Sequence, residues 1–208
     1  MVTELFSPAL LETIETLTRQ HHTIYPRVPP QGIYFEELAE RAFEICGAVS
    51  VVIGRSSPTF PGRDLLIGTQ RISIKSETGK STRRTIINIT KLCTTERDPW
   101  EPESLKSHVL QHLSRYDHIF MLRAMWPNDR NAISYQLVDI PVDLLRRIGT
   151  VGLAPVGRRT GRQSLGADIT DNGEVIFHVH FDGSDGKCQV RNLLISRCHV
   201  LRSWEQRR

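Results

Sequence analysis

Cysteine is scarce in this sequence, and its arrangement excludes two classes of protein. The 208 residues include four cysteines, and no two of them form a Cys-x-x-Cys pair. Structural zinc sites and small disulfide-stabilised secreted domains both depend on more regular spacings. Scattered cysteines in mostly apolar runs are typical of reduced core thiols and predict a cytoplasmic protein. They are Cys46, Cys93, Cys188 and Cys198.

Long apolar runs and the common catalytic loops are absent as well. No run has the length of a membrane-spanning helix, so we expect a soluble protein that does not enter a membrane. The sequence has no Walker loop, no dinucleotide-binding glycine motif and no nucleophile elbow, which leaves nucleotide hydrolases and esterases without support. Three scattered tryptophans are too few to predict a platform on which bases stack.

Positive charge is present in modest excess but is clustered. The formal net charge is +4 and the isoelectric point is near 9.0. Arginines gather in short segments, such as residues 157–162 with three of them. Local positive potential of this kind suits a polyanion, so we expect nucleic acid or an acidic protein as partner.

Length and hydrophobic periodicity predict one domain over residues 1–208 with alternating helices and strands. We expect helices over residues 7–20, 34–47, 102–116 and 142–148, and an irregular loop over residues 149–172. We expect strands over residues 48–53, 64–67, 71–77, 85–89, 119–125, 133–140, 174–181 and 187–201. This order predicts an α/β fold in which helices flank one central mixed β-sheet.

The expected strand over residues 71–77 carries the most informative pattern. Its apolar residues Ile72 and Ile74 alternate with polar ones, as in a half-buried strand. The polar face therefore presents Lys75 and Glu77 together. An ammonium beside a carboxylate is a pairing suited to orienting water near a metal ion.

A second carboxylate is expected at the same place. The run Pro-Gly-Arg-Asp ends at Asp64, next to an apolar stretch, and Gly68 and Thr69 offer a turn. The resulting hairpin would bring Asp64 beside Lys75. Two carboxylates can hold Mg²⁺, which takes oxygen ligands, so the pattern favours phosphodiester hydrolysis. An exposed hairpin with ordinary surface charges is the alternative interpretation.

Several segments resemble the SmaI family of type II restriction endonucleases, within the PD-(D/E)XK nuclease superfamily. The resemblance covers about residues 35–204. It rests on residues 61–64, 74–77, 116–123, 134–141, 181–183 and 188–190. It implies a restriction-endonuclease-like core over residues 34–125, with DNA-recognition and dimerisation elements over residues 126–208. It also implies cleavage of double-stranded DNA at a CCCGGG-like site.

One position departs from the nuclease pattern that the resemblance implies. Ser73 stands where an acid normally precedes the lysine by two residues, and serine supplies no carboxylate. Three residues are candidates for the missing acid. Glu77 shares the face of Lys75, Glu103 begins the third predicted helix, and Glu40 lies on the second. We expect Asp64 and Glu77 to bind Mg²⁺ and Lys75 to activate water.

Base recognition at a G·C-rich site requires donors in the major groove, where arginine pairs with guanine. The candidates for base contact are Arg123, Gln136, Arg158, Arg159, Arg162, Gln189, Arg191 and Asn192. Arg83 and Arg84, beside Lys80, are better suited to phosphates. A palindromic site favours a homodimer, and a companion DNA methyltransferase would act on the same site without contacting this protein.

Two rival hypotheses remain open. A DNA-binding protein with a degenerate nuclease fold is motivated by Ser73, and it predicts binding without cleavage. A nuclease for modified or structured DNA predicts that cleavage depends on that modification or structure.

Overall fold

The computed structural model describes residues 5–48, 50–52, 65–95, 99–126, 132–157 and 161–207. The chain divides into two compact units that interleave in sequence. Unit 1 contains Met1–Arg83, Tyr116–Ile140 and Cys198–Arg208, and unit 2 contains Arg84–Arg115 and Pro141–Arg197.

Two helices of unit 1 form where the sequence predicts helices. Helix α2 spans Pro8–Ile24 and is capped by Ser7, whose Oγ accepts a hydrogen bond from the Leu10 N–H at 3.2 Å. It extends past the predicted end at residue 20. Helix α3 spans Ile33–Ile45 and is followed by Gly47 in a left-handed conformation, with φ of 80°. No helix among the described residues is long and apolar enough to span a membrane.

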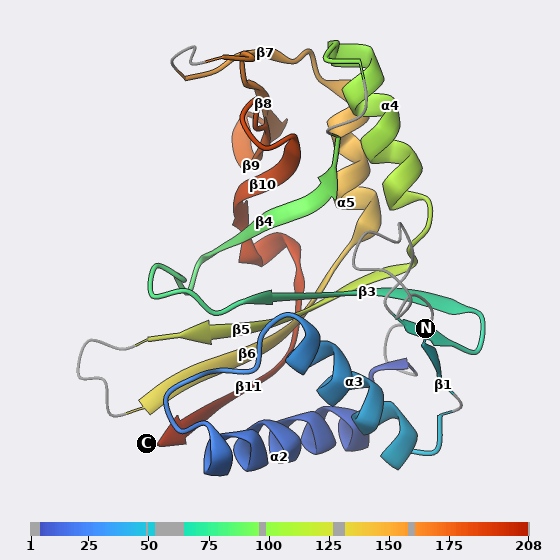
Figure 1. Ribbon diagram of the computed structural model, residues 1–208, viewed down its shortest axis with the longest axis vertical. Coiled ribbons are helices and arrows are strands. Elements are labelled where there is room, and N and C mark those ends of the chain that lie inside the picture. Colours follow the sequence, from blue (N-terminus) through green and yellow to red (C-terminus); the bar gives the residue numbers. More distant parts are fainter. Residues whose placement is uncertain are drawn as a thin grey trace. The chain divides into compact units, whose positions relative to one another are not determined.

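Unit 1 is built around a six-stranded mixed sheet with the strand order β1-β2-β3-β5-β6-β11 (Figure 1). The strands are β1 (Ser50–Val52), β2 (Leu65–Ile67), β3 (Gln70–Glu77), β5 (His118–Met125), β6 (Ala132–Ile140) and β11 (His199–Arg207). Strands β3 and β5 run parallel, whereas the other pairs are antiparallel. The mixed sheet that the sequence predicts is therefore present.

The predicted hairpin is confirmed for its described residues. Strand β2 pairs with β3 through Leu65 opposite Ile72, and Gly68 takes φ of 58° in the turn. A positive φ favours glycine because no Cβ clashes there.

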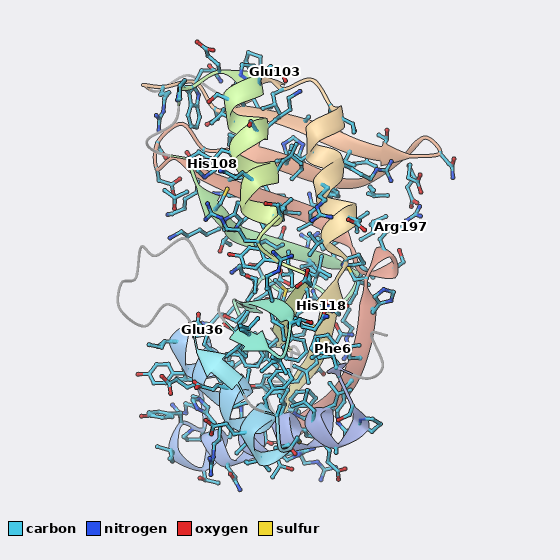
Figure 2. The ribbon with its side chains drawn as sticks, turned by 90° about the vertical axis from the view of Figure 1, so that its right-hand side faces the viewer. Phe6, Glu36, Glu103, His108, His118 and Arg197 are labelled. Carbon is cyan, nitrogen blue, oxygen red and sulfur yellow. The ribbon has the colours of Figure 1, made fainter. Side chains whose placement is uncertain are left out.

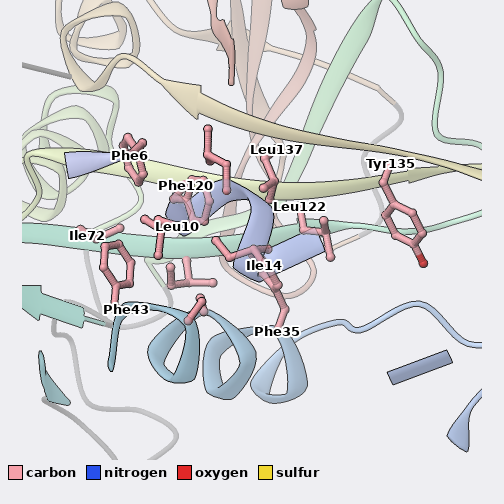
Figure 3. Close-up of a cluster of buried hydrophobic side chains, with 14 of the residues drawn as sticks. Phe6, Leu10, Ile14, Phe35, Phe43, Ile72, Phe120, Leu122, Tyr135 and Leu137 are labelled. Atoms are coloured by element: carbon pink, nitrogen blue, oxygen red, sulfur yellow. The ribbon is translucent and has the colours of Figure 1, made fainter. Parts of the chain in front are cut away.

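Helices α2 and α3 cover one face of this sheet. The face carries Ile72 and Ile74 from β3 and Phe120 from β5, all buried against α3 residues such as Phe35 (Figure 3). A buried hydrogen bond of 2.6 Å between His22 Nε2 and the Tyr135 hydroxyl also ties α2 to β6. Because side chains alternate along a strand, Lys75 belongs to the opposite face of β3.

Unit 2 contains a second sheet, which the sequence did not predict. Its strand order is β4-β10-β9-β8-β7, and all its pairs are antiparallel. The strands are β4 (Ile86–Thr94), β7 (Ala154–Pro155), β8 (Leu165–Asp171), β9 (Glu174–Phe181) and β10 (Lys187–Leu194). Helices α4 (Pro102–Leu113) and α5 (Val142–Arg146) belong to the same unit.

Three predictions about this part of the chain were wrong. Strand β4 and helix α4 belong to unit 2 rather than to one central sheet, because β4 pairs with β10, a strand far away in sequence. Strand β8 forms within the predicted loop, because its pairing with β9 outweighs the weak strand propensity of its glycine and aspartates. The strand expected over residues 187–201 is split into β10 and β11, which pair in different sheets.

Candidate functional site

Lys75 lies on β3, beside the serine that replaces the usual acid. Its Nζ donates to the Ser73 Oγ at 2.8 Å and to the Ile74 carbonyl oxygen at 3.1 Å. Ser73 is buried and Lys75 is half-buried. The serine hydroxyl is therefore a hydrogen-bond acceptor that anchors the ammonium group where a carboxylate would otherwise stand.

Glu77, at the end of β3, is held by an arginine in the interior of unit 1. The Nε of Arg123 donates to the Glu77 Oε2 at 2.8 Å, and the Glu77 side chain is 9% exposed. The same guanidinium donates to the Gln136 Oε1 at 2.7 Å and to the Arg83 carbonyl oxygen. Arg123 is completely buried, with 0% exposure.

Strand register explains why these three side chains meet. Glu77 of β3 is directly opposite Arg123 of β5, which is directly opposite Gln136 of β6. Opposing residues project from the same face of a sheet with their Cβ atoms about 5 Å apart. The planar guanidinium has donors pointing in several directions, so one arginine satisfies acceptors on both neighbouring strands.

This placement argues against two of the predicted base contacts. A side chain with no exposed surface cannot reach a base edge, so Arg123 is a structural partner of Glu77. Gln136 uses its amide oxygen to hold Arg123. Glu77, Arg123 and Gln136 meet because of the strand register. That register is established by tertiary pairing.

The candidate acids have different environments. Asp64 is outside the described residues; the following residue, Leu65, pairs with Ile72 at the start of β2. Glu40 is half-buried on α3, a helix that covers the face of the sheet opposite to Lys75. Glu103, on the first turn of α4 in unit 2, is 86% exposed and forms a 2.8 Å ion pair with Lys106 (Figure 2).

The described part of the chain offers few carboxylates for a magnesium ion near Lys75. Among these residues, no three His, Cys, Asp or Glu side chains come together to hold a metal ion. Mg²⁺ commonly uses only one or two carboxylates and completes its shell with water and substrate phosphate. The Glu77 carboxylate on the Lys75 face fits such a site as one ligand.

Reasoning from sequence missed Asp117, which is a neighbour of the Lys75 strand. Asp117 accepts hydrogen bonds from Arg71 Nε at 3.0 Å and from the Arg71 backbone N–H at 2.8 Å, and its Oδ1 is 2.7 Å from Arg71 NH2. The hydrogen bonds from Arg71, opposed by partial burial, hold the pKa of Asp117 below its ordinary value. The ion pair fastens the start of β5 to β3. Its signal in the sequence was only an acid just before a strand.

Arg162 in unit 2 rests against an aromatic ring. Its guanidinium carbon lies 3.9 Å from the centroid of the Trp100 ring, and its Nε donates to the Gly183 carbonyl at 3.2 Å. The Trp100 indole in turn donates to the Gln163 carbonyl at 2.7 Å. Arg162 is nevertheless exposed. Arg158 and Arg159, predicted for the same segment, are outside the described residues.

The predicted readers on β10 form a pair. Arg191 donates to the Gln189 Oε1 from Nε at 3.0 Å and from NH2 at 2.7 Å, and both side chains are half-buried. His180 lies opposite Gln189 on β9, and burial together with the charge of Arg191 lowers its pKa. Asn192 is exposed with φ of 55°, and its N–H donates to the Asn88 Oδ1 at 3.0 Å.

The two arginines predicted to contact phosphates are both exposed. Arg83 ends the first segment of unit 1, and Arg84 begins unit 2. The structure therefore leaves both side chains on the surface of their units.

The mixed α/β fold of unit 1, with a lysine on the strand that follows a β-hairpin, is compatible with the restriction-endonuclease-like class of nucleases. The chain belongs to the SmaI family, described as type II site-specific deoxyribonucleases, whose profile matches residues 1–206. It is 28% identical over 174 residues to the type II restriction enzyme SmaI of Serratia marcescens, covering 82% of this chain and 69% of that protein. The comparison with solved structures gave no significant match.

Proposed function

We propose that this protein is a Mg²⁺-dependent restriction endonuclease that hydrolyses double-stranded DNA at a short, palindromic, G·C-rich sequence of the CCCGGG or CCGG type. The observation that carries the proposal is the family match over residues 1–206. The position of Lys75 on the polar face of β3 agrees with it.

In this proposal Asp64 and Glu77 are the metal ligands. When bound, Mg²⁺ supplies charge stabilisation at the scissile phosphate and the leaving oxygen. Glu77 is oriented for this role by Arg123, whose hydrogen bond fixes one carboxylate oxygen. Asp64 stays a proposed metal ligand, as the sequence predicts, because it directly precedes strand β2, which pairs with β3.

Lys75 orients the attacking water. Its ammonium is already held by Ser73 and by the Ile74 carbonyl, so its position is set by the strand. A pre-oriented donor loses little conformational freedom when substrate binds. Ser73 thus acts on the lysine, and the carboxylate that the motif lacks is assigned to Glu77; Glu40 and Glu103 remain the alternative sources.

DNA sequence is read in this proposal by the exposed and half-buried polar residues of unit 2. Arg162 and Arg191 are the candidates for guanine, with Gln189 and Asn192 as supplementary contacts. Arg158 and Arg159 belong to the same set by sequence. Arg83 and Arg84 contact phosphates, which position the protein but carry no sequence information.

A palindromic site presents two equivalent half-sites, so we assign it to a homodimer in which each protomer contacts one half. Uncontrolled cleavage would also destroy the host chromosome. A companion DNA methyltransferase that modifies the same sequence in the cytoplasm would prevent this without touching the nuclease.

Ser73 motivates the two competing functions. A degenerate nuclease would keep the DNA-binding arginines and bind without cleaving. A nuclease for modified or structured DNA would cleave only substrates that carry that feature. These hypotheses differ from the main proposal in what ordinary duplex DNA undergoes.

The test is a digest of unmodified and methylated plasmid and phage DNA, with Mg²⁺ or with a chelator, followed by sequencing of the fragment ends. We expect discrete Mg²⁺-dependent bands from unmodified DNA that share one palindromic sequence and that Lys75→Ala abolishes. Tight duplex binding without cleavage would establish the degenerate protein instead. Cleavage confined to methylated DNA would identify the modification-dependent nuclease.

A further inference from the structure

The segment that follows β3 is a basic turn, defined here as residues 78–83, and it is fastened at both ends. At its start, the Trp126 Nε1 donates to the Thr78 carbonyl oxygen at 3.0 Å. At its end, Arg123 donates to the Arg83 carbonyl oxygen. Within it, the Thr82 N–H donates to the Gly79 carbonyl at 3.0 Å, which closes the turn.

Both fasteners come from the same neighbouring element. Arg123 lies on β5, and Trp126 directly follows that strand. A third contact reaches the turn from the segment before α3, where Gln31 Oε1 accepts from the Thr78 hydroxyl at 2.8 Å. The residues that hold the backbone of the basic turn in place therefore have no exposed charge that could bind a ligand.

The basic turn itself, in contrast, carries charged side chains that are exposed. Lys80 and Arg83 are both exposed. Cations on a surface turn are suited to DNA phosphates, whose contacts dominate affinity and its salt dependence. A turn that is already ordered has less conformational entropy to lose when it binds.

Arg123 also connects this turn to the nuclease strand. One of its nitrogens holds Glu77, two residues beyond Lys75, and another holds Arg83. Arg123 therefore helps, together with Trp126, to fix the distance between the surface cations and the Lys75 strand. An enzyme that binds one phosphate while it cleaves another needs a fixed distance between the binding residues and the catalytic residues.

We propose that Trp126 and Arg123 are positioning residues that hold the basic turn for contact with the DNA sugar-phosphate backbone at a set distance from Lys75. The inference rests on the proposed function for its substrate. It adds Trp126 and Arg123 as residues that affect DNA binding through the turn and contact no base. Arg123 is therefore no longer a candidate for base recognition.

The first test compares two matched tryptophan substitutions. Trp126→Phe removes the donor to Thr78 and keeps an aromatic ring. Trp204→Phe is the control, because the Trp204 Nε1 is buried in the same unit and has no hydrogen-bond partner among the described residues. Duplex binding is measured by fluorescence anisotropy in a chelator, over a series of salt concentrations.

We expect Trp126→Phe to weaken DNA binding about fivefold, the effect of one lost hydrogen bond, and to reduce the slope of log K against log salt. Lys80→Ala should reduce that slope by about 1, as expected for one phosphate contact. Trp204→Phe should leave both quantities unchanged. Equal effects of the two tryptophan substitutions would overturn the proposal.

A double variant separates positioning from a general loss of stability. In a Lys80→Ala/Arg83→Ala background the basic turn has no cation to present, so Trp126→Phe should cause no further loss of affinity. Arg123→Lys, which keeps a cation beside Glu77 but lacks the forked donors, should behave in the same way. If either substitution weakens binding equally in both backgrounds, it acts elsewhere and the proposal fails.

These measurements do not depend on cleavage. A protein that binds duplex DNA through the basic turn but never cuts would disprove the proposed function and leave this inference standing. A protein that cuts DNA while Lys80→Ala and Arg83→Ala leave affinity and salt slope unchanged would disprove this inference alone.

Discussion

The two units differ in where their charged side chains lie and in how these side chains are bonded. In unit 1 the Glu77 carboxylate is nearly buried and pairs with the buried Arg123, and the buried Asp139 carboxylate lies 3.2 Å from the His118 ring. In unit 2 the cations are held near the surface by local partners. Arg162 lies over Trp100, and Arg191 and Gln189 bond to each other across two residues of β10.

The contrast matches two different demands of a site-specific nuclease. Chemistry requires groups that stay within a fraction of an ångström of one geometry, and buried, fully bonded side chains supply that. Base recognition requires groups that can exchange a protein partner for a base, and half-buried surface pairs can do so. This contrast is the basis for our proposal that unit 1 carries the catalytic residues and unit 2 the residues that read the bases.

The largest expected effect is on catalysis in unit 1. Lys75→Ala should reduce single-turnover cleavage about 10²–10⁴-fold, the range for losing a group that handles the proton of the attacking water. Lys91→Ala, on the exposed surface of β4 in unit 2, is the matched control and should cleave at the normal rate. DNA affinity of both variants is measured alongside. Full activity of Lys75→Ala would break the assignment of catalysis to unit 1.

The next effect is on stability. Arg123→Met should lower the free energy of unfolding by about 3–5 kcal/mol, because it leaves the nearly buried Glu77 without its partner. Arg162→Met in unit 2 should cost less than about 1 kcal/mol, the worth of an exposed cation–π contact. Urea denaturation gives both values.

A second substitution sharpens this comparison. The double variant Arg123→Met/Glu77→Met removes both charges and should recover a substantial part of the lost stability. If Arg123→Met and Arg162→Met lowered the free energy of unfolding by equal amounts, the two units would not differ in how strongly their arginines are bound.

A smaller effect is expected on sequence recognition in unit 2. Arg191→Ala should reduce cleavage of the cognate site by about 1–3 kcal/mol, or roughly fivefold to 150-fold, and should relax the preference at one base position. Gln189→Ala, which removes the partner of Arg191, should have a weaker effect of the same kind. Cleavage of a set of single-base variants of the site measures both. A uniform loss over all sites would instead indicate a phosphate contact.

The smallest effect is the pH dependence of the Arg71 and Asp117 pair. The hydrogen bonds from Arg71 keep the pKa of Asp117 below its unfolded value near 4, so the pair contributes stability above that pH and loses it as the pH falls through the folded pKa. Asp117→Asn should cost about 0.2–1 kcal/mol at pH 7, as a surface ion pair does. Unfolding curves of both proteins should converge as the pH falls below 4. A constant difference at all pH values would contradict the ionic origin.

Much of unit 1 could be predicted because its signals are local. The cap at Ser7, the alternation around Lys75 and the turn at Gly68 each follow from the preferences of neighbouring residues. The helix ends were less predictable, since α2 continues to Ile24 where tertiary contacts such as that of His22 with Tyr135 hold its last turn.

Unit 2 was harder to predict because its structure depends on pairing between distant residues. Strand β8 has little strand propensity of its own, and its formation follows from β9 beside it. Strand β4 pairs with β10, and no feature of residues 85–94 indicates which sheet they join. The candidate readers Arg162 and Arg191 were found by residue type, whereas the contact of Arg162 with the Trp100 ring was not predicted.

The sequence by itself determined the α/β class, the hairpin that leads to Lys75, the family and hence the type of reaction. The α/β class and the hairpin follow from local periodicity and turn residues, whereas the family and the type of reaction follow from resemblance to known sequences. Tertiary structure alone decided that the chain folds as two units and that Arg123 lies inside, bonded to Glu77, Gln136 and Arg83. The reason is physical: whether a charged side chain meets solvent or a buried acceptor depends on which strands pair, and strand pairing is a property of the whole chain.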